Sequence, residues 1–243
     1  NLLGFTGSGV IAAVVDTGME ILHEDLSANV VAGGSWNFIT PTGTDPTNTV
    51  DIDGDHGTSV AGLIAMVKNN RGGIGVAPNA QLKGFNFLSG NQLFSELVAS
   101  LGGSNVNPRS NDVFVFNESF GTSPVNDTAI NTTVRDQLLS GVTTLRGGKG
   151  ALYVKAAGNG FGDIGGSAAR CGGAIALGVS CENANFDPEN TVPYQIVVGA
   201  VNANGVKASY STTGSAIWVS APGGEFGRTA ALVPGFPAEV YEP

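Results

Sequence analysis

Six short runs of apolar residues recur along the chain, separated by stretches in which apolar positions follow a helical spacing. The apolar runs predict buried strands at residues 10–15, 82–88, 113–116, 152–156, 195–201 and 217–220. The stretches between them predict helices at residues 57–67, 93–101 and 129–145, with Asp127 or Thr128 as the N-cap of the last. Because continuous apolar strands alternate with helices, we expect an α/β fold with a doubly wound, mostly parallel sheet and helices on both faces.

No internal repeat, low-complexity tract or long linker divides the sequence, so we expect a single domain over residues 1–243. Residues 40–49 are rich in Pro, Thr, Gly and Asn, which predicts a surface loop. Ligands of mostly parallel sheets bind outside the carboxyl ends of the strands. The residues that follow each predicted strand are therefore the first candidates for function.

Composition narrows the function classes. The chain has 11 basic and 20 acidic residues, a net charge of −9 and no basic run, which argues against nucleic acid or an anionic membrane surface as a partner. Charged residues make up 13% of the chain and it has 37 glycines, which excludes a coiled coil and most helical bundles. The apolar runs are far shorter than the roughly 18 residues of a membrane span.

The N-terminus suggests a processed, secreted protein, whereas the two cysteines alone cannot decide the compartment. The sequence opens at Asn1 without a leader, as expected of a processed mature form. Cys171 and Cys181 could close one small disulfide loop, as in extracellular proteins, or remain two buried thiols.

Three polar side chains stand where a predicted strand ends or a helix begins. Asp16 ends the first apolar run, His56 precedes a helix of small residues, and Asn159 follows the run at 152–156 between two glycines. Each alone has an ordinary structural role, such as capping a turn or adopting a left-handed turn conformation. Together they supply what acyl transfer needs: a carboxylate that orients an imidazole, an imidazole that moves the proton, and an amide that donates to the oxyanion.

In this order the three segments resemble the subtilisin-like serine proteases, or subtilases. The segments are GVIAAVVDTG at residues 9–18, DHGTSVAG at 55–62 and AGNG at 157–160. The resemblance implies a subtilisin-like fold and a serine endopeptidase. It also implies that Asp16 and His56 are members of the catalytic triad and that Asn159 is the oxyanion donor.

Further segments resemble the kexin and furin branch, which cleaves after basic residues: DTGMEILHEDL at 16–26, FLSG at 87–90 and TVPYQIVVGA at 191–200. This implies that Asp187 lies at the base of the primary specificity pocket. It also implies that Ser119, Phe120 and Gly121 form the edge strand that pairs with the substrate backbone.

The acidic triplet at residues 51, 53 and 55 has two interpretations. Asp53 could hold a second basic residue of the substrate, or the triplet is a solvated loop. The chain departs from the kexin branch at residues 122–125, where Thr-Ser-Pro-Val replaces an acidic pair, so a broad-specificity subtilisin is the enzymatic alternative.

The loop at residues 67–78, together with Asp25, resembles the strong calcium site of subtilisins. All the implied ligands are oxygens, as a hard cation requires. They are the side chains of Asp25 and Asn69 and the carbonyls of Val67, Arg71 and Gly73. The alternative is an ordinary Asn/Gly turn. The other histidine, His23, belongs to a structural segment of the family and is interpreted as non-catalytic.

The sequence contains no Gly-Thr-Ser-Met/Ala-Ala segment of the kind that carries the subtilase nucleophile. Residues 166–169 (GSAA) imitate it, but Ser167 follows Asn159 by only eight residues, ahead of two predicted strands. We therefore expect an incomplete catalytic domain, inactive alone, whose serine is carried by a segment beyond Pro243 on a second fragment.

The expected partners follow from this interpretation. They are polypeptide substrates, the C-terminal fragment with the serine, and a pro-peptide or inhibitor. The alternative from a different function class is a non-catalytic, subtilase-like module that binds peptides without cleaving them.

Overall fold

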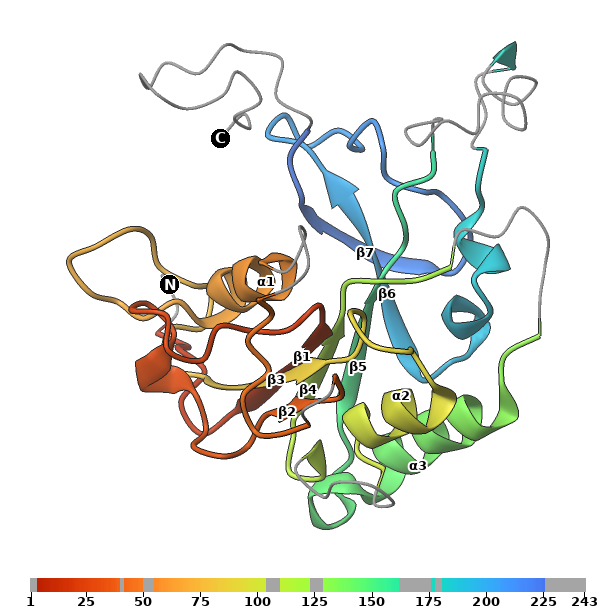
Figure 1. The fold of residues 1–243 in the computed structure, drawn as a ribbon. Helices are drawn as coiled ribbons and strands as arrows, with labels where there is room; N and C mark the ends of the chain where they lie inside the picture. The colour runs from red at the N-terminus through yellow and green to blue at the C-terminus, as the bar shows by residue number, and fades with distance from the viewer. Residues whose placement is uncertain are drawn as a thin grey trace. The chain divides into compact units, whose positions relative to one another are not determined.

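The computed structural model describes residues 4–39, 42–49, 55–103, 110–122, 129–161, 176–177 and 181–225 (Figure 1). The chain divides into two compact units. The first comprises Asn1–Ser119 and Asn131–Val154, and the second comprises Phe120–Ile130 and Lys155–Pro243. The architecture is the α/β type predicted from the sequence, and all of the strand pairings described below are parallel.

The first unit is built around strand β1 (Ile11–Asp16), which pairs with β3 (Gln81–Asn86) on one side and β4 (Val115–Glu118) on the other. The two-residue strand β2 (Trp36–Asn37) flanks β3, and β5 (Leu152–Ala156) follows β4. The order β2-β3-β1-β4-β5 places β1 at the centre. Its small and β-branched side chains are buried from Ala12 to Val15, as expected for a strand covered on both faces.

Helices cover both faces of this sheet. On one face, Ala12 and Val14 of β1 pack with Ala61 and Ala65 of helix α1 (His56–Ala65). Ala13 points to the other face, because side chains alternate along a strand. There it is in register with Phe116, whose ring stacks on Tyr153 with centroids 4.9 Å apart.

Two further helices complete that second face. Helices α2 (Phe94–Ser100) and α3 (Thr132–Gly148) pack against each other, as Figure 1 shows. Gly141 of α3 lies directly against the Tyr153 ring. The Tyr153 hydroxyl donates to the Leu101 carbonyl at the end of α2 (2.8 Å). Burial raises the pKa of this hydroxyl, so it stays a donor at all ordinary pH values.

The second unit contains the remainder of β5, strand β6 (Gln195–Val201) and strand β7 (Ile217–Pro222). Ala157, just after β5, donates to the Val198 carbonyl of β6 (2.9 Å). Two short 3-10 helices, η3 (Ala184–Phe186) and η4 (Pro188–Thr191), precede β6. In the parts of the chain that the structure describes, no helix has the length and apolarity to cross a membrane.

Two local predictions need correction. Helix α3 begins at Thr132, three residues later than predicted, because Asn131 is its N-cap: the Asn131 Oδ1 accepts from the backbone N–H groups of Thr133 and Val134. The predicted caps Asp127 and Thr128 lie outside the described residues. The loop at 42–49 is not wholly on the surface, because Pro46 is buried and its carbonyl accepts from Met19 N (3.2 Å).

The start of helix α1 is fixed by a close approach to the turn after β1. Gly57 N donates to the Thr17 hydroxyl (3.3 Å). A Cβ at Gly57 would overlap the carbonyl oxygen of Gly18 and lie 2.9 Å from the Asp16 Cβ. Gly62, further along the same helix, has room: its Cβ would first meet the Met66 Cε at 3.5 Å.

Replacing Gly57 with Ala should therefore destabilise the protein. We expect a loss of about 1–3 kcal/mol, because the added methyl group overlaps backbone atoms that cannot move aside. Gly62→Ala is the matched control, and it should be neutral or stabilising by about 0.5–1 kcal/mol, as for other glycines in helix interiors. Urea unfolding of the two variants of the full-length protein measures the difference. Equal stabilities would contradict the close approach.

Candidate active site

Asp16 and His56, 40 residues apart in the sequence, are in direct contact. Asp16 is the last residue of β1 and fully buried, and His56 is the first residue of α1 with its side chain 50% exposed. The His56 Nδ1 lies 2.7 Å from the Asp16 Oδ1. With the Nδ1 proton donated to the carboxylate, Nε2 of the neutral ring is left to accept a proton from another group.

Backbone hydrogen bonds hold the Asp16 carboxylate in place. Thr17 N donates to the Asp16 Oδ1 (2.7 Å), and the Asp16 carbonyl accepts from the N–H groups of Phe87 and Leu88 (both 3.0 Å). The second carboxylate oxygen, Oδ2, is buried and has no hydrogen-bond partner among the described residues. In the described chain, the hydrogen bonds of the carboxylate are thus confined to Oδ1, the oxygen that faces the His56 ring.

The turn after β1 has a second set of anchors. The Thr17 carbonyl accepts from the Ser89 hydroxyl (3.1 Å) and from the Asn48 side-chain amide (3.0 Å), and that amide also donates to the Ser89 Oγ (2.7 Å). The FLSG segment at residues 87–90, which served in the sequence only as a mark of resemblance, therefore has a physical role. It locks the turn that carries Asp16.

Asn159, in the second unit, stands on a turn fixed from both sides. The Gly158 carbonyl accepts from Thr212 N (3.0 Å), and Gly160 N donates to the Thr212 hydroxyl (2.8 Å). Gly158 has φ = +106°, a conformation that favours glycine. The Asn159 side chain is exposed and makes no hydrogen bond to any described residue, so its amide N–H groups are available to a ligand.

Asp187, the predicted base of the specificity pocket, is buried between the helices η3 and η4. Its Oδ1 accepts from Glu189 N, which caps η4, and its Oδ2 accepts from Thr122 N (both 3.0 Å). A Cβ at Gly121 would lie 2.5 Å from the same Oδ2. The structure therefore brings Asp187 together with the predicted substrate-pairing segment.

The other predicted substrate-binding residues are placed as follows. Phe120 belongs to the same unit as Gly121 and Asp187, whereas Ser119 is the last residue of the first unit's N-terminal segment and accepts there from the Asn117 side-chain amide (2.9 Å). Asp53 lies outside the described residues, as do Cys171 and Ser167. The Cys171–Cys181 disulfide stays a prediction.

Sequence reasoning missed Lys155. Its side chain is fully buried, and the ammonium donates to the Phe120 carbonyl (2.7 Å) and lies 3.6 Å from the Asp187 Oδ2 and 3.3 Å from the Glu189 Oε2. The available signal was a single charged residue within the apolar run at 152–156. A lysine in a buried strand must have an acidic or carbonyl partner.

Of the predicted calcium ligands, Asn69 and Val67 contact Asp25, which is 7% exposed. Asn69 Nδ2 donates to the Asp25 Oδ1 (2.6 Å), and Val67 N donates to the Asp25 carbonyl (2.9 Å). Arg71 N donates to the Asn69 Oδ1 (2.8 Å), while its guanidinium pairs with the exposed carboxylate of Glu24. Among the described residues, the Asp25 carboxylate has no ion pair. A buried carboxylate without an ion pair is compatible with a hard cation.

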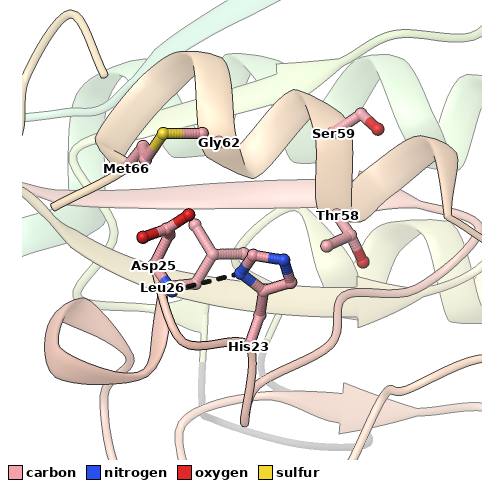
Figure 2. A pocket seen from close by; sticks show the side chains of 7 residues that line it. All are labelled: His23, Asp25, Leu26, Thr58, Ser59, Gly62 and Met66. Atoms are coloured by element: carbon pink, nitrogen blue, oxygen red, sulfur yellow. Dashed lines mark hydrogen bonds between the residues drawn. The ribbon is translucent and has the colours of Figure 1, made fainter. Parts of the chain in front are cut away.

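A pocket of about 180 Å³ lies beside this loop, between residues 23–26 and helix α1 (Figure 2). His23, Asp25, Leu26, Thr58, Ser59, Gly62 and Met66 line it. The His23 Nδ1 accepts from Asp25 N (3.1 Å), the dashed line in Figure 2. This bond ties the imidazole to its own loop, in keeping with a structural role for His23. In the described parts of the chain, no three His, Cys, Asp or Glu side chains are grouped as a metal site.

Comparison with known proteins extends these observations. Residues 7–240 match the model of the subtilase family. An extracellular serine protease of Aeromonas sobria is 46% identical over 238 residues, covering 95% of this chain and 37% of that protein. Kexin of Saccharomyces cerevisiae is 35% identical over 221 residues, covering 87% of this chain and 24% of kexin.

Solved structures are similar to this chain as well. The crystal structure of the Aeromonas sobria serine protease in complex with the chaperone ORF2 has a TM-score of 0.80 and 41% identity, covering 92% of this chain and 37% of that one. The chain thus spans little more than a third of the length of these Aeromonas proteins. The buried carboxylate at the end of β1, the imidazole that begins α1 and the match over residues 7–240 lead to one conclusion: the chain belongs to the subtilase family.

Proposed function

We propose that the full-length protein is a secreted serine endopeptidase that hydrolyses peptide bonds with an Asp16–His56–Ser triad. The observation that carries this proposal is the 2.7 Å contact between the His56 Nδ1 and the fully buried carboxylate of Asp16. The nucleophile belongs to a polypeptide segment outside these 243 residues. Two facts support this: the sequence has no Gly-Thr-Ser-Met/Ala-Ala segment, and the relatives are much longer.

The roles of the residues follow from their hydrogen bonds. His56 Nε2 takes the proton of the serine hydroxyl as the oxygen attacks the substrate carbonyl, and later gives it to the leaving amine. Asp16 stabilises the imidazolium that forms in between, because its carboxylate is buried and already bound to Nδ1. Asn159 Nδ2 donates to the oxyanion that develops on the carbonyl oxygen.

A preference for basic residues is supported by the kexin relatives and by local charge. Among the residues that the structure describes, Asp187 and Glu189 place two carboxylates around one ammonium, that of Lys155, which leaves a net negative charge. Asp53 is proposed to hold a second basic side chain. Broad specificity is the second candidate, and the observation in its favour is that both oxygens of Asp187 already accept hydrogen bonds from the protein.

Secretion and partners complete the proposal. The Aeromonas sobria relative is named an extracellular protease, and one crystal structure of that protein contains a chaperone. By analogy, this protein acts outside the cell on polypeptide substrates and is bound by a pro-peptide, inhibitor or chaperone during folding. A Cys171–Cys181 disulfide suits the same compartment.

We also propose a structural Ca²⁺ ion in the loop next to Asp25. The carboxylate of Asp25 and the side-chain oxygen of Asn69 would hold it, together with the carbonyls of Val67, Arg71 and Gly73. Such an ion supplies no catalytic step. It stabilises the folded state, because it binds that state and not the unfolded chain.

The triad can be tested by active-site labelling of the full-length protein. We expect a fluorophosphonate probe to label one serine outside residues 1–243. Asp16→Asn should label far more slowly and lower kcat by about 10⁴-fold, because the imidazole loses its orienting anion. Asp136→Asn, which changes an exposed carboxylate on α3, should behave as the unmodified protein. If nothing is labelled and no peptide is cleaved, the chain is part of a non-catalytic peptide-binding module.

The role of Asn159 can be tested separately. Asn159→Ala should lower kcat by about 10²–10³-fold, the loss known for the oxyanion asparagine of subtilisin, with a smaller effect on KM. Asn204→Ala, at another exposed asparagine of the same unit, is the control. Steady-state kinetics on one peptide substrate measures both. A kcat within threefold of the unmodified enzyme would exclude Asn159 as the oxyanion donor.

Calcium binding can be measured through stability. Adding Ca²⁺ to the chelator-treated, full-length protein should raise the Tm, corresponding to about 2.7 kcal/mol when the ion is at 100 times its Kd. Asp25→Asn should abolish this response. Glu24→Gln, at the exposed neighbouring carboxylate, should keep it. An unchanged calcium response in Asp25→Asn would mean that any ion binds elsewhere.

A further inference from the structure

Lys155 is a buried cation that contacts Phe120, Asp187 and Glu189, which lie in or beside the predicted substrate-binding region. Its side chain is 0% exposed, and it lies in strand β5. An ammonium group is retained in such a place only when anions and hydrogen-bond acceptors replace its water. Here the replacements are the Phe120 carbonyl at 2.7 Å, the Glu189 Oε2 at 3.3 Å, the Asp187 Oδ2 at 3.6 Å and the face of the Phe120 ring, whose centroid is 4.7 Å away.

These are the groups that would recognise the ammonium or guanidinium of a substrate. Asp187 is 5% exposed, and its oxygens also accept from the backbone N–H groups of Glu189 and Thr122. The Glu189 side chain is more accessible, at 17% exposed. A substrate cation that approaches this pair of carboxylates must therefore share them with Lys155, and like charges at such distances repel.

We propose that Lys155 is a specificity-determining residue. Its ammonium is a resident counter-ion of Asp187 and Glu189 and competes with a basic side chain of the substrate for the same carboxylates. The preference for Arg or Lys over an apolar residue is thereby weakened, and the protein accepts both. This inference rests on the proposed function, since it assigns a role within the same substrate-binding site.

Lys155 also has a positioning role, and the two roles predict different results. The Lys155 ammonium binds the Phe120 carbonyl, and Asp187 binds Thr122 N; if the segment is extended when substrate binds, both bonds anchor the same side of it. The N–H and carbonyl of Gly121 then face the other side, where a substrate backbone can pair with them. Loss of this anchor weakens the cleavage of all substrates equally. Loss of the counter-ion changes the ratio between basic and apolar substrates.

The experiment measures that ratio in the full-length protein. Two peptides that differ only in Arg or Leu before the cleaved bond are compared by kcat/KM. Lys155→Met keeps the length of the side chain and removes its charge. We expect the Arg:Leu ratio of kcat/KM to rise about tenfold or more, even if kcat/KM falls for both peptides. A ratio within twofold of the unmodified enzyme overturns the counter-ion role and leaves only the positioning role.

Lys155→Met leaves two carboxylates without their cation and could therefore fail to fold. A second variant keeps the proposal testable in that case. Glu189→Gln removes one carboxylate from a partly exposed position, so that Asp187 and Lys155 neutralise each other. It should lower the Arg:Leu ratio about fivefold or more, and an unchanged ratio contradicts the proposal in the same way. The double variant Lys155→Met/Asp187→Asn loses the cation and one carboxylate together, so its net charge equals that of the unmodified site and its ratio should fall below that of Lys155→Met.

Lys83→Met is the matched control. Lys83 is the other lysine of the described chain with a nearly buried side chain, 4% exposed, and it pairs with Asp112 at 2.6 Å in the first unit. Its loss should lower stability by a similar mechanism while leaving the Arg:Leu ratio unchanged. Failure of the proposed function has a different signature: the unmodified protein then cleaves neither peptide and reacts with no fluorophosphonate.

Discussion

The geometry of the candidate site depends on one steric constraint, the close approach of Gly57 to Gly18. Helix α1 begins directly on the turn that follows β1, where no Cβ fits between the two backbones. This approach brings the first side chain of the helix, His56, within hydrogen-bond distance of the last side chain of the strand, Asp16. The anchors at Thr17, from Ser89 and Asn48, then hold the turn against that helix. The contact between Asp16 and His56 is thus a product of backbone packing.

Both units bury a charge at the place where function is proposed. The first unit buries Asp16 with one carboxylate oxygen lacking a hydrogen bond in the described chain, and the second buries Lys155 against two carboxylates. Buried charges of this kind contribute little to stability, because their desolvation offsets the attraction between them. Such charges instead affect the binding of ligands and the protonation of neighbouring groups, and both are features of a functional site.

Much of the fold could be predicted from the sequence, because the apolar runs report local burial directly. The six predicted strands correspond to β1 and β3 to β7. The two-residue strand β2 has too few residues to produce a pattern. The N-cap Asn131 was missed in favour of Asp127 or Thr128, since several capping residues stand close together and only the backbone geometry selects one.

Part of the candidate site could also be identified from local sequence. Asp16, His56 and Asn159 are recognisable because each lies in a short motif at an element's end. The partners of Lys155 are not, because Phe120 and Glu189 are more than 30 residues away on either side and only tertiary contacts bring them together. An isolated lysine in an apolar run shows that a partner exists but not which residue it is.

The two methionines of the chain differ in a way that bears on oxidative damage. Met19 is fully buried, whereas Met66 is half-buried, lines the pocket below α1 and has its sulfur beside Gly73 in the loop proposed to bind calcium. Oxidants therefore reach Met66 first. A sulfoxide there is polar and larger, and it would disturb the loop around Asp25 without touching Asp16 or His56. Oxidation of this protein would thus appear first as heat sensitivity, with Asp16 and His56 still chemically intact.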